Sequence, residues 1–252
     1  MMRHVVLTSD GLHLAGELHQ PRTAGPHPAL CICHGIPAVP FNPADTGYHD
    51  LAARFADLGL VTLIFNLRGA GLSEGDFDML GWSRDIGSAI DLLLEEEAVD
   101  PSGVFLMGFS GGAAAGIHRA AADARVAGVI SCASPAHFRD LTGDGELDQC
   151  LARWREIGII RDPAFPANLE SWAAGFLEVA PAAHVGCLAP RPLLILHGDA
   201  DEVVPLSHAH DLFNAAHDPK QLSIIPGGMH RLRVNEQAMS TAVDWLRALT
   251  TG

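Results

Sequence analysis

Short apolar runs alternate with helical segments along most of the chain, and this alternation restricts the fold more than any other feature. ALCIC at 29–33 and LVTLIFN at 60–66 are almost entirely apolar, as strands buried on both faces are. Between such runs the apolar residues take helical spacing. The series predicts a mostly parallel sheet with helices on both faces, an α/β fold. The expected strands are 12–19, 29–33, 60–66, 103–108, 125–134, 192–198 and 221–227, and the expected helices are 49–59, 82–97, 111–121, 206–216 and 235–249.

The α/β pattern continues through the chain with one interruption. The 252 residues, 48% of them hydrophobic, suit one domain over 1–252, with the first strands antiparallel at one edge of the sheet. Residues 135–188 contain no strand-like run and predict a helical insertion between two strands. This insertion is either a crossover with extra helices or a small cap over a site at the carboxyl edge of the strands.

Two pentapeptides fit the G-x-S-x-G pattern of a nucleophilic serine on a sharp strand-to-helix turn: GLSEG at 71–75 and GFSGG at 108–112. The strand VFLM leads directly to Ser110, and an Ala-rich helix follows it, so amides at the helix N-terminus would face an oxyanion. Ser73 lies several residues beyond its strand and precedes no helix. The context therefore predicts Ser110 as the nucleophile and Ser73 as part of a Gly-rich loop.

A serine hydroxyl needs a histidine to remove its proton and a carboxylate to orient that histidine. In this type of sheet the three residues occur in the order Ser, acid, His on strand-end loops. HGDADEVVP at 197–205 offers Asp201, with Asp199 as the rival acid. His230, in PGGMH after the last strand, is the predicted base.

Backbone N–H groups must also stabilise the oxyanion that forms during acyl transfer. One donor is expected from Gly111, the residue after the nucleophile. The loop HGIPAVP after the strand 29–33 should supply the other, through the N–H of Ile36. His34 in this loop is interpreted as a bracing residue rather than a catalyst.

The strings CHGIP, NLRGAGLSEG, GFSGG, HGDADEVVP and GGMH occur in the order and spacing of an α/β-hydrolase. From about residue 10 onward the chain resembles that superfamily, and most closely small bacterial esterases and prolyl-oligopeptidase-like catalytic domains. The resemblance implies a triad of Ser110, Asp201 and His230, oxyanion donors at Ile36 and Gly111, and no cofactor.

The chain departs from the superfamily pattern at two positions. HGIPAVP lacks the second glycine that many relatives carry after HG, which leaves the exact oxyanion donor open. Asn66 stands where many relatives have Asp, and we expect this change to affect only the bracing of the loop.

The expected activity is that of a carboxylesterase-like serine hydrolase acting on a small-molecule ester through an acyl-enzyme. A peptidase, a thioesterase and a non-catalytic ligand binder that retains the triad are the alternatives. Aromatic residues in loops or in the insertion would either favour a hydrophobic acyl group or pack the insertion: Phe41, Trp82, Trp154, Phe165, Trp172 and Phe176.

Metal-dependent hydrolysis is a minor alternative. Cys31, Cys33 and His34 lie close together, and an HxH string occurs at 208–210, but no second pair has zinc spacing, so no metal is expected.

Composition and charge also limit the kinds of partner that we expect for this chain. The net charge of −14 argues against nucleic acid, and no apolar run reaches about 18 residues, so no membrane span is expected. The N-terminal residues lack the pattern of a secretory signal. Oligomeric state is left open, with a homodimer as one option. The cysteines form no CxxC pair and are read as reduced thiols of a cytoplasmic protein: Cys31, Cys33, Cys132, Cys150 and Cys187.

Overall fold

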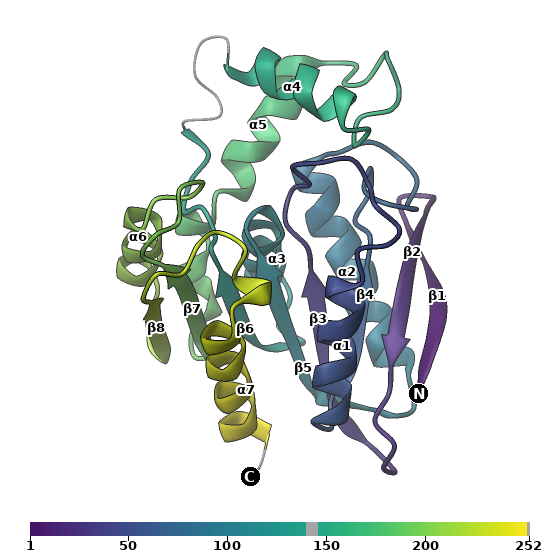
Figure 1. The fold of residues 1–252 in the computed structure, drawn as a ribbon, viewed down its shortest axis with the longest axis vertical. Helices are drawn as coiled ribbons and strands as arrows, with labels where there is room; N and C mark the ends of the chain where they lie inside the picture. Colours follow the sequence, from purple (N-terminus) through teal and green to yellow (C-terminus); the bar gives the residue numbers. More distant parts are fainter. Residues whose placement is uncertain (140–145, 251–252) are drawn as a thin grey trace.

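The computed structural model describes residues 1–139 and 146–250, which form one central sheet and the helices around it (Figure 1). The strands are β1 (Met2–Ser9), β2 (Leu12–His19), β3 (His27–Cys33), β4 (Val61–Phe65), β5 (Val99–Phe109), β6 (Val126–Cys132), β7 (Leu193–Gly198) and β8 (Lys220–Ile225). The helices are α1 (Gly47–Asp57), α2 (Met79–Glu95), α3 (Gly111–Ala122), α4 (Glu146–Glu156), α5 (Leu169–Val179), α6 (Ser207–Ala215) and α7 (Glu236–Thr250), with short 3₁₀ turns η2 (Pro181–Ala183), η3 (Val185–Leu188) and η4 (Leu232–Val234).

The strands lie in the order β1-β2-β4-β3-β5-β6-β7-β8. β1 and β2 are antiparallel to their neighbours, and all other pairs are parallel. The order reverses at β3, which has β4 on one side and β5 on the other. Ligands of open α/β sheets bind outside the carboxyl ends of the strands at such a switch point. The predicted fold class, a mostly parallel α/β sheet, is confirmed.

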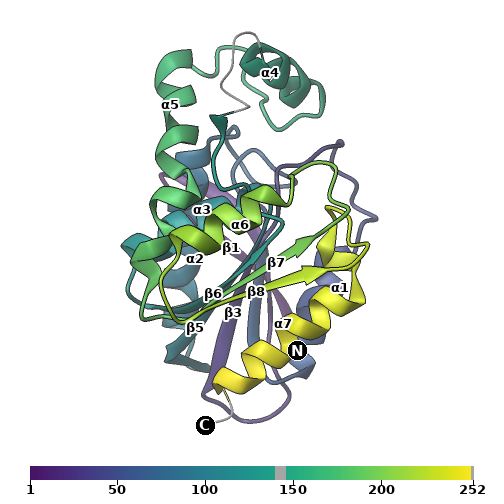
Figure 2. The ribbon, with the colours of Figure 1, turned by 90° about the vertical axis from the view of Figure 1, so that its left-hand side faces the viewer.

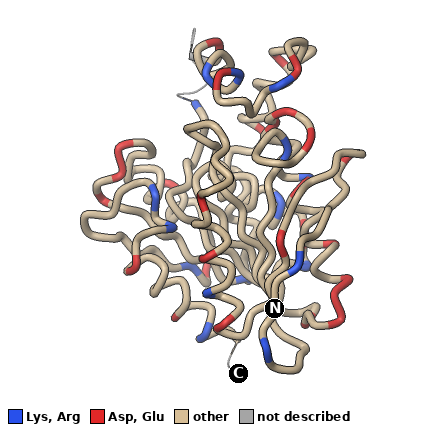
Figure 3. Tube along the Cα trace, turned by 45° about the vertical axis from the view of Figure 1, so that its right-hand side comes forward, with Lys and Arg blue, Asp and Glu red and all other residues tan. Residues whose placement is uncertain are grey.

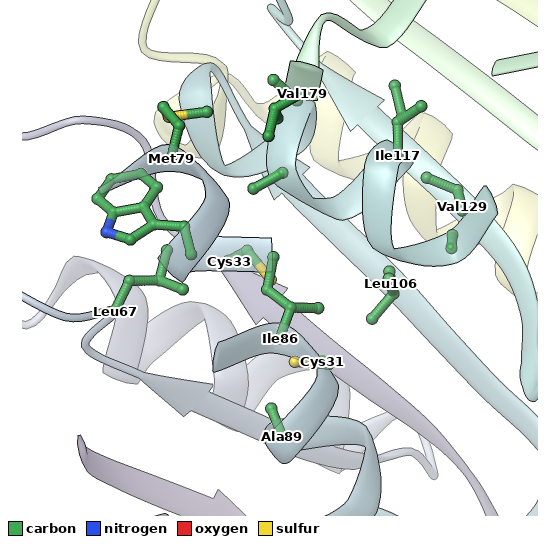
Figure 4. Close-up of a cluster of buried hydrophobic side chains, with 14 of the residues drawn as sticks. Cys31, Cys33, Leu67, Met79, Ile86, Ala89, Leu106, Ile117, Val129 and Val179 are labelled. Carbon is green, nitrogen blue, oxygen red and sulfur yellow. The ribbon is translucent and has the colours of Figure 1, made fainter. Parts of the chain in front are cut away.

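Helices cover both faces of the sheet (Figures 1 and 2). One hydrophobic cluster joins the sheet to α1 and α7, and the other joins it to α2, α3 and α6. Figure 4 shows the second cluster: Cys31 of β3 and Leu106 of β5 lie beneath Ile86 of α2 and Ile117 of α3. The near-continuous apolar runs in the sequence reflect this double burial.

The elements match the predicted ranges with three notable differences. β5 begins at Val99 rather than at residue 103. β1 was not expected from the sequence, yet it pairs with β2 over its whole length. α2 begins at Met79 rather than at residue 82. Its N-terminus is set by Asp78, whose carboxylate accepts hydrogen bonds from the N–H groups of Leu80 (3.2 Å) and Gly81 (2.9 Å).

The segment expected as an insertion contains α4, α5, η2 and η3, and its residues 140–145 lie outside the described residues. α4 and α5 extend beyond one end of the sheet (Figures 1 and 2). The guanidinium of Arg153 in α4 donates to the carbonyl of Ala38 at 3.0 Å, so α4 reaches the loop that follows β3. A single domain over 1–252 and a cap at 135–188 stay predictions.

Charged residues occur mainly at the periphery of the chain trace, while the central strands are largely uncharged in the view of Figure 3. A buried exception is Arg68, whose guanidinium binds the fully buried carboxylate of Asp85 at 2.6 Å and Asp10 at 2.8 Å. Within the described ranges, every helix is too short or too polar to cross a membrane.

Candidate active site

Ser110 lies on the sharp turn between β5 and α3, with backbone angles φ 52° and ψ −124°. Positive φ is strained for a residue with a side chain and costs on the order of 1–3 kcal/mol. Ser110 is the N-cap residue of α3, but its hydroxyl makes no capping hydrogen bond. Serine at this position normally caps through its oxygen, so the strain and the missing capping bond together mark the residue as unusual.

The two glycines of GFSGG permit the close contacts of this turn. A Cβ atom on Gly108 would lie 2.3 Å from the Cα of Ala113, and one on Gly112 would lie 2.1 Å from the carbonyl oxygen of His34. Both distances are far inside van der Waals contact. The small residues therefore let α3 begin immediately after β5 and lie against the end of β3.

The loop after β3 lies directly on the turn that holds Ser110. A Cβ on Gly35 would be 3.1 Å from the Cβ of Ser110, and a Cβ on Gly111 would be 2.7 Å from Cγ1 and 3.7 Å from the backbone nitrogen of Ile36. The two predicted oxyanion donors, Ile36 and Gly111, thus lie next to each other beside the serine.

His34 braces this loop, as the sequence indicated. The N–H of Leu67, just beyond β4, donates to Nε2 of His34 at 3.1 Å, which makes Nδ1 the protonated nitrogen and the donor to the carbonyl of Gly35 at 2.8 Å. Burial lowers the pKa of His34, so the ring stays neutral and keeps both bonds. The ring also packs edge-on against Trp82 of α2.

Asp201 and His230 contact each other through the loops after β7 and β8. Oδ2 of Asp201 accepts a hydrogen bond from Nδ1 of His230 at 2.8 Å, and Oδ1 accepts from the N–H groups of Val203 and Val204, each at 2.9 Å. Burial alone would raise the pKa of Asp201, but the bonds from His230 and the two amides outweigh it and hold the pKa below its usual value. An ionised Asp201 fixes the proton of His230 on Nδ1 and leaves Nε2 as the basic nitrogen.

The rival acid Asp199 has a different partner. Its Oδ1 accepts from the N–H of Gly227 at 2.6 Å, in a turn where Gly227 has φ 66°. Asp199 therefore braces the turn after β8, and Asp201 is the acid that meets His230.

His197 is a supporting residue to which the sequence interpretation assigned no role. It is fully buried at the end of β7, where Nε2 donates to the carbonyl of Val204 at 2.8 Å and lies 3.5 Å from Oδ2 of Asp201. Burial lowers its pKa, which favours the neutral ring. In the sequence, the one indication of this supporting role was the position of His197 at the strand end in HGDAD.

Ser73 is also buried, and its hydroxyl is fully used. It donates to the carbonyl of Asn66 and accepts from the N–H of Ala15 at 3.0 Å. Asn66 accepts from the N–H of Leu72 through its side-chain oxygen. The GLSEG string is therefore a structural loop next to β2, in agreement with the interpretation of the sequence.

A model of the prolyl oligopeptidase family matches residues 48–251. The chain belongs to the prolyl oligopeptidase family. The match contains Ser110, Asp201 and His230, and it begins after the loop with Ile36. With its α/β-hydrolase fold, this prolyl oligopeptidase family member is a hydrolase, as the sequence resemblance implied.

Two relatives and one solved structure illustrate the similarity. Protein Rv2307c of Mycobacterium tuberculosis is 28% identical over 227 residues, which cover 90% of this chain and 71% of that protein. Thiohydrolase apmlB of Arthrinium phaeospermum is 34% identical over 137 residues, covering 52% of this chain and 42% of that protein. The crystal structure of the α/β hydrolase GrgF from Penicillium sp. sh18 matches with a TM-score of 0.78 at 22% identity over the full length of both chains, which shows a shared fold.

In this family member most of the aromatic residues considered for substrate binding pack against one another. Trp82, Trp154, Trp172 and Phe176 are buried, and all four contact the ring of Phe77. They join the insertion to the start of α2. Phe165 lies against Trp172 and is partly buried, whereas Phe41 in the loop after β3 is 51% exposed.

Several residues considered as metal ligands make other contacts in the described structure. Cys31 and Cys33 are buried in β3, and the hydrogen bond to Cys31 together with burial raises the pKa of the Cys33 thiol. A protonated thiol is a poor metal ligand. His208 of α6 accepts a hydrogen bond from the N–H of Ala136 at 3.0 Å.

Proposed function

We propose that the protein is a serine hydrolase that cleaves a small carboxylic ester through an acyl-enzyme. Ser110 is the nucleophile, His230 the general base and acid, and Asp201 the residue that orients His230. The backbone N–H groups of Ile36 and Gly111 form the oxyanion hole.

The observation that carries this proposal is the strained backbone of Ser110 at a strand-to-helix turn whose hydroxyl does not cap the helix. A structural serine at a helix N-terminus would bond the helix amides, and it would gain nothing from a positive φ. The Asp201–His230 hydrogen bond adds support, because it leaves Nε2 as the basic nitrogen on a loop at the same sheet edge. The order Ser, Asp, His along the chain is that of α/β-hydrolases.

The proposed reaction begins when Nε2 of His230 removes the proton from Ser110 as its oxygen attacks the ester carbonyl. The imidazolium that forms is stabilised by the ionised Asp201. The N–H groups of Ile36 and Gly111 stabilise the negative charge on the carbonyl oxygen, and this stabilisation is usually the largest contribution to catalysis of acyl transfer. His230 then protonates the leaving alcohol, and a water activated by the same histidine releases the acid from the acyl-enzyme.

The packing of the insertion bears on the size of the acyl group that the protein would accept. Since four of the six aromatic candidates are buried against Phe77, they support a packing role rather than an aromatic binding surface. We therefore propose a small ester, with a thioester as the second candidate. The second candidate is favoured by the 34% identity to a thiohydrolase, which extends over 52% of this chain. The proposed partner is a small molecule, and the proposed location is the cytoplasm, because Cys31, Cys33 and Cys132 are buried free thiols in the described structure.

The two G-x-S-x-G serines provide a matched test. Ser110→Ala should lower turnover of a p-nitrophenyl ester by roughly 10⁴-fold or more and abolish labelling by a fluorophosphonate, whose fluoride is displaced by the Ser110 oxygen. Ser73→Ala should retain labelling and turnover but lose roughly 1–3 kcal/mol of stability, because the partly buried N–H of Ala15 loses its acceptor.

Unchanged turnover in Ser110→Ala would show that another residue attacks the substrate. Folded wild-type protein that neither hydrolyses esters or thioesters nor reacts with the fluorophosphonate would favour the non-catalytic binder. Comparison of a short acyl ester, its thioester and its amide ranks the three leaving groups directly.

A further inference from the structure

Two histidines and one carboxylate converge on the α1 side of the sheet, away from the proposed catalytic residues. Oε2 of Glu17 lies 2.7 Å from Nδ1 of His49 and 3.0 Å from Nε2 of His19. Glu17 and His19 are two apart on β2 and share a face, while His49 comes from the first turn of α1. One ligand atom from each residue lies within 4.8 Å of the others.

We propose that Glu17, His19 and His49 form a binding site for a divalent transition metal ion such as Zn²⁺. Imidazole nitrogens and a carboxylate oxygen are the borderline ligands that Zn²⁺ prefers, and two histidines with one carboxylate are a known three-ligand set for it. The site is distinct from the Cys and His-x-His positions that the sequence had brought into consideration. It is also independent of the proposed hydrolysis.

Binding of an ion requires the ligand atoms to rearrange, because the three atoms lie within 4.8 Å of one another and must reach the spacing of a coordinated ion. Zn–N and Zn–O bonds of about 2.0–2.1 Å at tetrahedral angles put ligand atoms roughly 3.3 Å apart. The two distances to Glu17 are slightly shorter than this, so an ion would push Glu17 outward by a few tenths of an ångström. The His19 and His49 rings already meet edge to face, with centroids 4.9 Å apart.

The surroundings offer a fourth position and a route of entry. His4 of β1 is the direct cross-strand partner of Glu17, and such partners point to the same side of a sheet. His4 and Glu17 both line a cavity of about 160 Å³ that also reaches Tyr48. Water that enters through this cavity can thus complete the coordination. The side chain of His19 is 5% exposed and that of His49 is 40% exposed, so the ligand set is anchored on one side and open on the other.

An ion here would tie β2 to the first turn of α1. Tyr48, beside His49, packs edge-on against Phe109, which precedes the nucleophile, and against His34 of the proposed oxyanion loop. Metal binding would therefore stabilise the edge of the sheet and the base of that loop together. The alternative is that Glu17 only accepts hydrogen bonds from the two histidines, in which case the cluster binds no ion.

The test is a titration of the full chain with Zn²⁺ after chelator treatment, followed by calorimetry and by thermal unfolding. Wild-type protein should bind one ion at this site, and Tm should rise by about 5–10 °C at a free Zn²⁺ concentration near one hundred times Kd. Glu17→Gln and His49→Ala should weaken binding at least about 10-fold. His49→Ala, at a partly exposed helix position, is the variant that should fold most readily.

His13→Ala is the matched control. Nδ1 of His13 lies 3.1 Å from Oε2 of Glu74, so this pair has the same chemistry as the site, but among the described residues it is not part of a three-ligand group. His13→Ala should bind Zn²⁺ as wild type does. Absence of binding by wild type, or equal affinity in folded His49→Ala, Glu17→Gln and wild-type protein, would overturn the assignment. Ester turnover is not used as a readout, so failure here leaves the proposed hydrolase untouched.

Discussion

Gly112→Ala tests whether the close approach of α3 to the loop after β3 sets the proposed oxyanion hole. The new Cβ would lie 2.1 Å from the carbonyl oxygen of His34, where ordinary contact begins at 3.4 Å. The loop must therefore retreat by about 1.3 Å. Because the contact is with backbone, no side-chain rotation can relieve it.

A shift of this size would move the N–H of Ile36 away from the oxyanion. Loss of one oxyanion donor costs roughly 10²–10³-fold in kcat, and misplacement by about 1 Å elsewhere in active sites costs a similar factor. We expect kcat for a p-nitrophenyl ester to fall about 10²-fold with a small change in KM, since the displaced donor acts mainly in the transition state. The steric cost to stability should be about 1–3 kcal/mol.

Gly116→Ala, one turn along the same helix, is the control. A Cβ there meets nothing within 4 Å, so the substitution should leave kcat unchanged and stabilise α3 by about 0.5–1 kcal/mol. Steady-state kinetics and urea unfolding of both variants give the comparison. If Gly112→Ala retained kcat within about threefold of wild type, the loop after β3 would not supply the oxyanion donor.

Two further substitutions probe Asp201 and the buried Arg68. Asp201→Asn should lower kcat by roughly 10⁴-fold, since an amide disfavours the required His230 tautomer. Folding lowers the pKa of Asp201, so its contribution to stability is complete above the unfolded-state pKa near 3.8 and is lost as pH falls through the lower folded-state pKa. In urea unfolding from pH 7 downward, the difference in unfolding free energy between wild type and Asp201→Asn should shrink below about pH 4. A difference that stays constant over this range would contradict the argument. Arg68→Ala should lower the free energy of unfolding by about 3–5 kcal/mol, because it leaves the Asp85 carboxylate buried without its partner. The double variant Arg68→Met with Asp85→Leu should recover most of that loss in the same assay. An Arg68→Ala protein as stable as wild type would show that the ion pair is dispensable.

The sequence predicted the parallel strands well because their apolar runs reflect burial on both faces, a local property. β1 was missed for the opposite reason. Its residues alternate between exposed and buried, with only Val5, Leu7 and Ser9 facing the core, and its stability comes from pairing with β2. An edge strand of this kind has a weak local pattern, and its partner decides whether it forms.

The loops of the candidate site were predictable because strand-end glycines and polar residues occur in fixed order along the chain. The cluster of Glu17, His19 and His49 was not predictable, because Glu17 and His49 are separated by 32 positions and meet only where α1 packs near β2. For His197 the sequence offered only its place at the strand end in HGDAD, since its bond to the carbonyl of Val204 depends on how the loop after β7 folds back.

The aromatic residues show why residue type alone could not define the substrate. Trp154, Trp172 and Phe176 come from the insertion, and Phe77 comes from the segment before α2, yet all four form one buried cluster. The N–H of Phe77 also donates to the carbonyl of Ile159 at 2.9 Å, which ties the insertion to the core by backbone as well. Aromatic side chains that are buried in this cluster are unavailable for contact with an acyl group. Changes within this cluster should therefore act on stability before they act on substrate preference.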